Sequence, residues 1–157
     1  MNADTALVIM RHEAGDAGRP HVNSGAADKV LALATAFRKA GRPVIPVRHA
    51  DSDPASPLHP EGSGYPPMPC AVEQFGEAVF VNRRSSAFAT TALAAHLRER
   101  GLSHLCLVGA VAGFCGNSTA RTACDPGLRV TLAPDAVLGS DLPLVGLEAR
   151  TVFDVTM

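Results

Sequence analysis

One residue of this sequence, Cys115, stands where a nucleophile could be activated. The apolar run at residues 105–108 is typical of a strand buried on both faces of a parallel sheet, and small residues then allow a sharp turn. Residues 117–121 continue with a helical pattern, which places Cys115 at a helix N-terminus. The positive potential and N–H groups there lower the pKa of a thiol and hold an oxyanion. The pattern favours nucleophilic chemistry; the competing interpretation is a small buried hydrophobe, which is what most cysteines outside disulfides are.

Strands and helices alternate along the chain and would position this cysteine. Short apolar runs predict strands at residues 5–10, 44–47, 78–81, 105–108 and 128–132. Helical periodicity predicts helices over residues 24–41 and 90–100 and after Cys115. This alternation indicates an α/β fold, in which a parallel sheet carries helices on both faces. Ligands of such sheets bind outside the carboxyl ends of the strands, which is where Cys115 would lie.

Composition and charge exclude several classes of protein. The 157 residues are enough for one domain, and 46% of them are apolar. A formal charge of -1 gives no electrostatic footprint for nucleic acid or for an anionic membrane. The four cysteines have no CxxC spacing, which argues against a zinc ribbon or a disulfide framework and indicates reduced thiols. No stretch approaches the roughly 20 apolar residues of a membrane span, so we expect a soluble cytoplasmic protein.

Three segments resemble the isochorismatase-like cysteine hydrolases, a superfamily that includes nicotinamidases and N-carbamoyl amidohydrolases. The segments are the cysteine loop at residues 109–123 (GAVAGFCGNSTARTA), the SAF-x-x-T-x-L turn at residues 83–93, and the first strand at residues 5–9 (TALVI). Asp135-Ala136 also resembles a family signature. The resemblance implies a three-layer α/β/α, Rossmann-like fold with strand order 3-2-1-4-5 in a single domain over residues 1–157. The family's last helix would begin at residue 148, and the chain is expected to be short at its C-terminus.

The resemblance also implies a catalytic triad, of which this chain keeps one member. In the family an Asp ending the first strand accepts the thiol proton, a Lys ending the third strand stabilises charge, and the Cys attacks the substrate. Cys115 matches the nucleophile, but Met10 stands at the Asp position and Asn82 at the Lys position. Methionine has no exchangeable proton and asparagine carries no charge, so neither can replace its counterpart.

Two functions therefore compete. One is a cysteine hydrolase that acts on C–N bonds of small amide-like substrates through Cys115. The alternative is a catalytically impaired member, a pseudoenzyme, that binds a small ligand or a partner through the same pocket. A third alternative, an isomerase or a vinyl-ether hydrolase working without the Cys, is weaker because such members normally keep the Asp.

His12 offers a substitute proton acceptor. It lies two residues beyond Met10, so an extended backbone would point both side chains to the same side of the sheet. A Cys115–His12 dyad is one interpretation, and a histidine in an ordinary loop is the other. The resemblance further implies a cis peptide bond between Ala110 and Val111, and an oxyanion hole made from the backbone N–H groups of Val111 and Cys115.

Three more residues are candidates for the substrate pocket. Phe88 would cover the substrate or belong to the core, and His49 would face the mouth of the pocket or lie in a loop. Arg83, with its neighbour Arg84, would bind a carboxylate bidentately or remain solvated. Residues 49–75 form a Pro-rich loop whose length indicates a function, and the resemblance assigns it to the substrate mouth and to subunit contacts.

We expect no metal, no cofactor and a homo-oligomer. Residue types that bind a metal occur together at His49, Asp51, Asp53 and His59, but their spacing does not match the nicotinamidase metal site. The expected partners are a small-molecule substrate and further copies of the chain, because family members commonly form dimers or tetramers. Apolar side chains that a monomer rarely exposes would mediate this contact: Leu142, Leu144, Val145, Leu147 and Val152.

Overall fold

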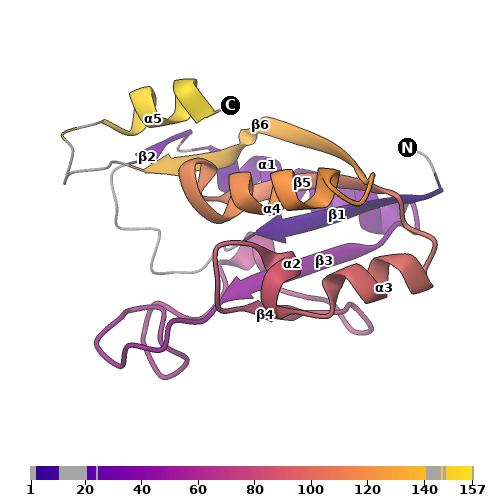
Figure 1. Ribbon diagram of the computed structural model, residues 1–157, viewed down its shortest axis with the longest axis horizontal. Coiled ribbons are helices and arrows are strands. Elements are labelled where there is room, and N and C mark those ends of the chain that lie inside the picture. The colour runs from indigo at the N-terminus through magenta and orange to yellow at the C-terminus, as the bar shows by residue number, and fades with distance from the viewer. Residues whose placement is uncertain (1–2, 11–20, 24, 141–145, 147, 157) are drawn as a thin grey trace.

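The computed structural model describes residues 3–10, 21–23, 25–140, 146 and 148–156, and within them six strands form one sheet with helices on both faces (Figure 1). The strands are β1 (Thr5–Met10), β2 (His21–Val22), β3 (Val44–His49), β4 (Phe80–Asn82), β5 (His104–Ala110) and β6 (Arg129–Ser140). The helices are α1 (Ala26–Lys39), α2 (Ala87–Thr90), α3 (Leu93–Glu99), α4 (Asn117–Cys124) and α5 (Ala149–Thr156). Two short turns of helix, η2 (Pro69–Ala71) and η3 (Ala112–Gly116), complete the described elements.

The strand order confirms the expected topology. The sheet runs β2-β6-β5-β1-β3-β4, and its last five members are parallel to their neighbours. Counted along the chain without β2, this is the order 3-2-1-4-5. The helix expected at residue 148 is present as α5.

The sixth strand corrects the expectation from the sequence, which had no strand between residues 10 and 44 and ended the last strand at residue 132. Strand β2 pairs antiparallel with the far end of β6, with His21 opposite Ser140. The pairing of β6 with β5 is irregular at one point: Leu107 pairs with Leu132 and Gly109 with Val137, so the four residues between Leu132 and Val137 bulge out of the ladder. Beyond this bulge β6 continues to Ser140. Pro134 and Asp135 lie in this interruption, and both residue types are rare inside regular strands. Because of these two residues, the sequence pattern does not show that the strand continues beyond residue 132.

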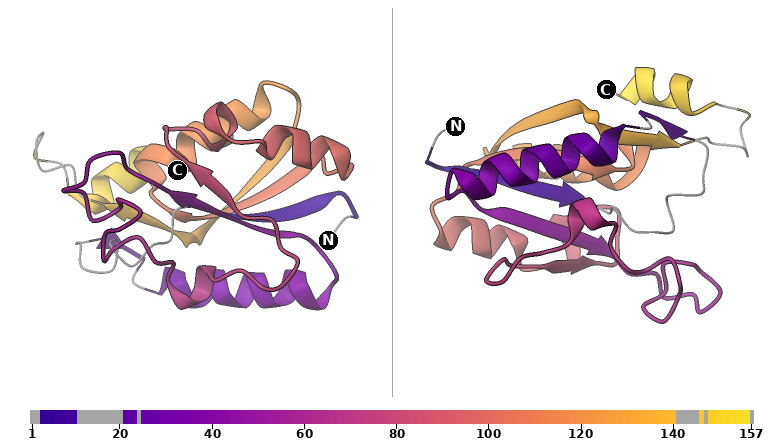
Figure 2. Two further views of the ribbon diagram at one scale, coloured as in Figure 1. Left: turned by 90° about the horizontal axis from the view of Figure 1, so that it is seen from below. Right: turned by 180° about the vertical axis from the view of Figure 1, so that it is seen from behind.

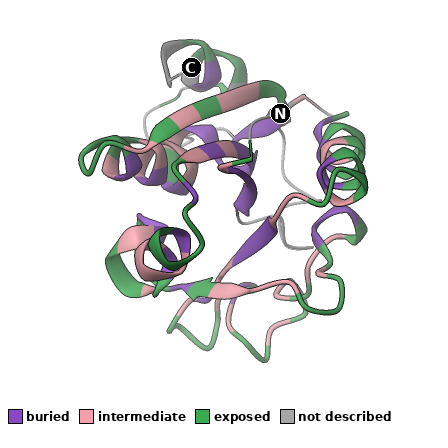
Figure 3. Cartoon of the chain, turned by 90° about the vertical axis from the view of Figure 1, so that its right-hand side faces the viewer, coloured by how far each residue is buried: buried purple, intermediate pink, exposed green. Residues whose placement is uncertain are grey.

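The sheet is buried on both faces, as the uninterrupted apolar strands predicted. Alternate residues of β1 point to opposite sides: Val8 joins the cluster under α2 to α4, whereas Leu7 and Ile9 join the cluster under α1. Figure 2 shows α1 on one face with α3 and α4 on the other, and Figure 3 shows the buried residues gathered on the central strands. This double burial fixes the register of the strands, because a slip of one residue would exchange the two faces.

The helix expected over residues 90–100 is present as α3 (Leu93–Glu99), and a separate short helix that was not expected, α2 (Ala87–Thr90), precedes it. Thr91 breaks them apart with an extended backbone at φ -127° and ψ 165°. Its hydroxyl donates to the Ala87 carbonyl at 2.7 Å and accepts the Leu93 N–H at 3.1 Å, so it closes one helix and opens the next. Helical periodicity misses α2 because its four residues make only about one turn of helix, which is too short to show a repeat.

The carboxyl ends of β1 and β5 approach each other so closely that only glycine fits between them. Gly109 lies opposite Met10 in the parallel register and has a φ of +107°. A Cβ atom built on Gly109 would lie 2.0 Å from the carbonyl oxygen of Met10. This contact sets where the turn beyond β5 begins, and therefore where Cys115 lies.

Two ion pairs tie the end of the Pro-rich loop and the residues just after it to the body of the fold. Arg48 donates to both oxygens of Glu73 at 2.7 and 2.6 Å, and Arg38 donates to both oxygens of Glu77 at 2.8 and 2.9 Å. Burial raises the pKa of Glu77, but the hydrogen bond from Arg38 and the backbone N–H of Gln74 outweigh it, so the net pKa is lowered. The Arg38–Glu77 pair thus stabilises the fold at neutral pH, and its contribution disappears as the pH falls through the lowered pKa of Glu77.

Several expectations fall on residues outside the described part of the chain. His12 and the apolar residues 142, 144, 145 and 147 are among them, as is the side chain of Val152, so the expected dyad and dimer surface stay predictions. Among the described residues, no helix has both the length and the apolar character needed to cross a bilayer.

We expect Gly109→Ala to prevent or severely weaken folding, because the new methyl group would overlap the Met10 carbonyl. Gly127→Ala is the matched control: Gly127 also has a positive φ, +87°, but a Cβ there meets nothing within 4 Å. The control should lower the free energy of unfolding by about 1 kcal/mol, the cost of the backbone conformation alone. Chemical denaturation of both variants measures the difference. Similar losses for the two variants would show that the contact between β1 and β5 is not tight.

Candidate functional site

Cys115 lies in η3, the irregular turn between β5 and α4. The thiol residue is buried, with 6% of its surface exposed. The carbonyl of Val111 accepts the N–H groups of Phe114 at 3.1 Å and Gly116 at 3.4 Å, which folds the turn back on the end of β5. Phe114 has non-helical angles, φ -130° and ψ -111°, so η3 and α4 meet at a kink. The Ala110–Val111 peptide bond is cis, as expected.

A cavity of about 470 Å³ opens in front of Cys115 at the carboxyl ends of β3, β4 and β5. This is the edge of the sheet at which ligands of parallel α/β folds bind. Its lining residues are His49, Arg83, Arg84, Ser85, Gly113, Phe114, Cys115 and Ser118. A neighbouring cavity of about 310 Å³ shares His49, Arg83 and Arg84 and extends to Asp51, Ser52 and Thr90. The structure thus brings a thiol, an imidazole and two guanidinium groups to one opening.

The expected pocket residues separate into two groups. His49 and Arg83 line the cavity with Cys115, whereas Phe88 packs against the core cluster beneath α2 to α4 and is not among the lining residues. Phe114, which the sequence analysis did not select, lines the cavity instead and is 45% exposed. The sequence could have indicated Phe114 as a cavity residue, because it directly precedes Cys115.

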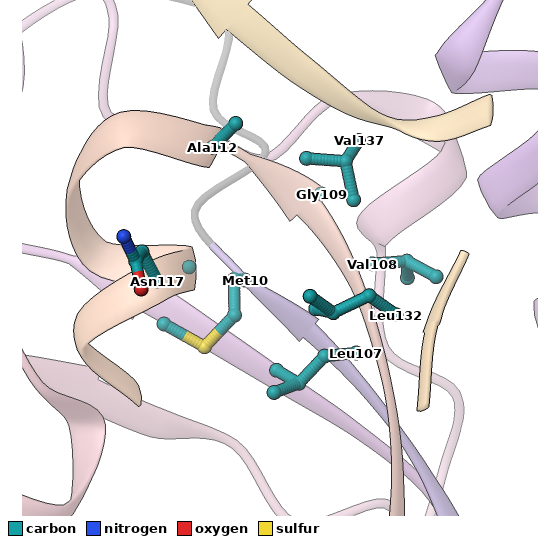
Figure 4. A pocket seen from close by; sticks show the side chains of 9 residues that line it. Met10, Leu107, Val108, Gly109, Ala112, Asn117, Leu132 and Val137 are labelled. Carbon is teal, nitrogen blue, oxygen red and sulfur yellow. The ribbon is translucent and has the colours of Figure 1, made fainter. Parts of the chain in front are cut away.

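Met10, which the resemblance places at the Asp position of the family triad, is 1% exposed and belongs to the same apolar cluster as Cys115. Figure 4 shows its side chain lying between β5 and the first turn of α4, which carries Asn117. Around it is a cavity of about 30 Å³ whose remaining side chains are apolar except for that of Asn117. Such a space holds at most one water molecule. None of its lining residues is a proton acceptor of the kind an Asp would be.

Asn82, which the resemblance places at the Lys position, uses its amide to build the turn beyond β4. The side chain is 1% exposed. Its Nδ2 donates to the Arg84 carbonyl at 2.5 Å, and its Oδ1 accepts the Arg84 N–H at 3.0 Å and the Thr90 hydroxyl at 3.1 Å. Thr90 in turn accepts the N–H of Arg83 at 3.3 Å. Both ends of the amide are engaged in the turn, so this position shapes the cavity wall.

The SAF-x-x-T-x-L turn has a structural explanation of the same kind. The Ser86 hydroxyl accepts the Phe88 N–H at 3.2 Å and caps α2. The hydroxyl of Thr119, which is fully buried in α4, accepts the Ala87 N–H at 3.1 Å. The motif therefore joins the cavity wall that carries the arginines to the helix that follows Cys115.

The other thiols and the acidic loop have different environments. Burial raises the pKa of Cys70 to about 11 and also raises the pKa of Cys106, so both are neutral thiols near neutral pH. Cys124 is exposed. Asp51 accepts the N–H of Asp53 at 3.2 Å, a contact internal to the loop. Within the part of the chain that the structure describes, no three His, Cys, Asp or Glu side chains are grouped so that they could hold a metal.

The fold and the site define a three-layer α/β protein with a cysteine at the carboxyl edge of its parallel sheet. An isochorismatase domain model matches residues 5–146, and the chain belongs to the isochorismatase family. Its sheet and flanking helices are the isochorismatase-like hydrolase fold.

Solved structures and curated relatives agree with this assignment. A crystal structure of an isochorismatase-family protein from Chromobacterium violaceum superposes with a TM-score of 0.92 at 26% identity, covering 99% of this chain and 84% of that one. An isochorismatase from Pseudomonas putida gives a TM-score of 0.87 at 28% identity, covering 97% and 80%. The secreted isochorismatase effector Isc1 of Verticillium dahliae is 29% identical over 143 residues, 90% of this chain and 70% of its own. The isochorismatase family protein YecD of Escherichia coli O157:H7 is 30% identical over 147 residues, 84% of this chain and 78% of its own.

We expect Asn82→Ala to lower the free energy of unfolding by about 1–3 kcal/mol, because it leaves the Arg84 backbone groups and the Thr90 hydroxyl without their buried partner. Asn117→Ala is the control, since the Asn117 amide accepts one exposed hydrogen bond, from Arg121 at 2.9 Å. That variant should lose less than about 0.5 kcal/mol. Urea unfolding followed by circular dichroism makes the comparison, and an equally small loss for both would refute the structural role of Asn82.

Proposed function

We propose that this chain is a cysteine hydrolase that cleaves a C–N bond in a small amide-like substrate, with Cys115 as the nucleophile. The observation that supports this most directly is the placement of Cys115 in the wall of the 470 Å³ cavity, beside the kink that opens α4. A cavity of this size suits a small molecule. Membership in the isochorismatase family, whose fold the chain has, supports the same class of substrate.

The proposed reaction has two steps. The sulfur of Cys115 attacks the carbonyl carbon, and the resulting oxyanion accepts hydrogen bonds from the backbone N–H groups of Val111 and Cys115. When the C–N bond breaks, the amine leaves with the proton that the thiol lost, and a thioester remains. Water then attacks the thioester and the C–S bond breaks. One proton of the water goes to the sulfur, the other is released to solvent, and the carboxylate product leaves. We assign the transfer of the proton to His12.

Met10 and Asn82 favour a second candidate function, the binding of a small ligand or partner without turnover. The residue at the Asp position is apolar and buried, and the amide at the Lys position is engaged in the turn beyond β4. Loss of triad partners costs several orders of magnitude in turnover in other hydrolases. Hydrolysis of nicotinamide or of simple N-carbamoyl compounds is accordingly expected to be weak or undetectable.

We also propose that the protein acts in the cytoplasm as a dimer or tetramer and needs no cofactor. The family resemblance supports these points, whereas the curated relative from Verticillium dahliae is named a secreted effector.

Alkylation by iodoacetamide near neutral pH should label Cys115 faster than the other three cysteines. Cys70 and Cys106 should react slowest, because burial raises the pKa of each and keeps the thiol protonated. Peptide mass spectrometry over a time course gives the rate at each site, and Cys115→Ala identifies the labelled peptide. Faster labelling of exposed Cys124 than of Cys115 would contradict nucleophilic activation.

Replacing the proposed proton acceptor, His12→Ala, should slow the labelling of Cys115 near neutral pH by about tenfold or more, a modest share of the effect that general bases commonly have. His59→Ala is the control, because the His59 ring accepts the Glu61 N–H within its own loop at 3.3 Å. An unchanged rate in His12→Ala would remove His12 from the mechanism.

Restoring the carboxylate, Met10→Asp, should raise the rate of Cys115 labelling by at least roughly tenfold. Met10→Asn is the matched control, with the same shape and no base. The double change Met10→Asp with Asn82→Lys should raise thiol reactivity further only where the turn at residues 82–90 survives the loss of the Asn82 amide. Equal labelling rates for the Asp and Asn variants would show that a carboxylate at position 10 does not activate the Cys115 thiol.

A further inference from the structure

Arg83 and Arg84 form an unpartnered pair of cations in the cavity wall. Both are exposed and both line the 470 Å³ cavity with Cys115 as well as the adjoining 310 Å³ cavity. The ion pairs that arginines make among the described residues involve other positions: Arg38 with Glu77, Arg48 with Glu73, Arg129 with Asp4 and Arg150 with Asp154. Within the described part of the chain, neither guanidinium group at positions 83 and 84 has a hydrogen bond or an ion pair.

The charges around this pair favour an anion. His49 lines both cavities, and Asp51 is the acidic residue among the lining residues of the larger opening that the two cavities form. The Asp51 carboxylate accepts the Asp53 N–H within its own loop, and this hydrogen bond lowers its pKa. Asp51 therefore stays ionised, and its one negative charge is outweighed by the two positive charges of Arg83 and Arg84 in the lining of the cavities.

The backbone beneath the two arginines is held by buried side chains. The Asn82 amide binds both the N–H and the carbonyl of Arg84, and the Thr90 hydroxyl accepts the N–H of Arg83. Because Thr90 also donates to Asn82, the three contacts form one network behind the arginines. A fixed backbone reduces the ordering that binding requires, which is the usual advantage of a preorganised site.

We infer that Arg83 and Arg84 bind a carboxylate group of the substrate, and that Asn82 is the positioning residue that holds them beside Cys115. Guanidinium groups match a carboxylate with two parallel hydrogen bonds, so they select for it over a neutral group of the same shape. This inference rests on the proposed function and narrows its substrate class to short amides that carry a carboxylate a few bonds from the scissile C–N bond. Asn82 itself is uncharged, but by holding the backbone of Arg83 and Arg84 it keeps their positive charge at the carboxyl end of β4.

A matched pair of alkylating reagents tests the inference. Iodoacetate carries a carboxylate and iodoacetamide a neutral amide, so the ratio of their rates at one thiol reports the preference for an anion. We expect this ratio at Cys115 to exceed the ratio at exposed Cys124, in the same protein, by roughly tenfold or more, as expected of charge-assisted hydrogen bonds. Arg83→Gln and Arg84→Gln should each lower it, whereas Arg98→Gln, an exposed arginine of α3 outside both cavities, should leave it unchanged.

The positioning role of Asn82 is tested by the same ratio, which a loss of stability alone would not move. Asn82→Ala and Thr90→Val should lower the ratio at Cys115 toward that of Cys124. Thr90→Ser keeps the hydroxyl and should retain the ratio of the unaltered protein. An unchanged ratio in Asn82→Ala, measured where the variant is folded, would overturn the positioning role.

Binding to the Cys115→Ala protein separates this inference from the proposed function. In titration calorimetry succinamate should bind at least about tenfold more tightly than neutral succinamide, and Arg84→Gln should reduce this difference. Arg84-dependent binding of succinamate together with an inert Cys115 would support the anion site and reject the hydrolase. Rapid alkylation of Cys115 with no preference for iodoacetate or succinamate would support the nucleophile and overturn the anion site.

Discussion

The structure depends on the contact between the carboxyl ends of the two central strands, β1 and β5. Gly109 lies against the Met10 carbonyl with no space for a Cβ atom, and its positive φ starts the turn that leads to Cys115. Burial of both faces of β1 fixes its register, because its alternate side chains belong to two different apolar clusters. The position of the thiol at the edge of the sheet follows from these two facts.

Met10 and Asn82, which the resemblance places at two positions of the family triad, have structural roles of opposite kinds. Met10 fills apolar space beneath α4 and leaves a cavity no larger than a water molecule, so the end of β1 contributes packing. Asn82 is equally buried but polar, and it satisfies both of its amide groups by fixing the chain at Arg84. A buried polar side chain with complete hydrogen bonding specifies a single local conformation. The consequence is a cavity whose charge comes from residues beside the triad position.

Sequence reasoning reached the fold and the position of Cys115 in the turn after β5, because both follow from strong local signals. The apolar runs and helical periodicity gave the parallel sheet, and the small residues around Cys115 indicated the turn after β5. The division of α2 from α3 at Thr91 and the pairing of β2 with β6 were missed, since each depends on contacts between segments and leaves no periodic pattern. For the same reason the sequence did not predict the structural role of Asn82. Only the folded chain brings the Arg84 N–H and the Thr90 hydroxyl to the Asn82 amide.

The central claim is that one cavity holds a carboxylate at Arg83 and Arg84 while it presents an amide to Cys115. A crystal structure of the Cys115→Ala protein with succinamate tests it most directly. The account predicts the carboxylate within hydrogen-bond distance of one or both guanidinium groups, and the amide carbonyl directed to position 115 and the N–H of Val111. Succinamate bound with its carboxylate away from both arginines, or with its amide turned from position 115, would contradict the account.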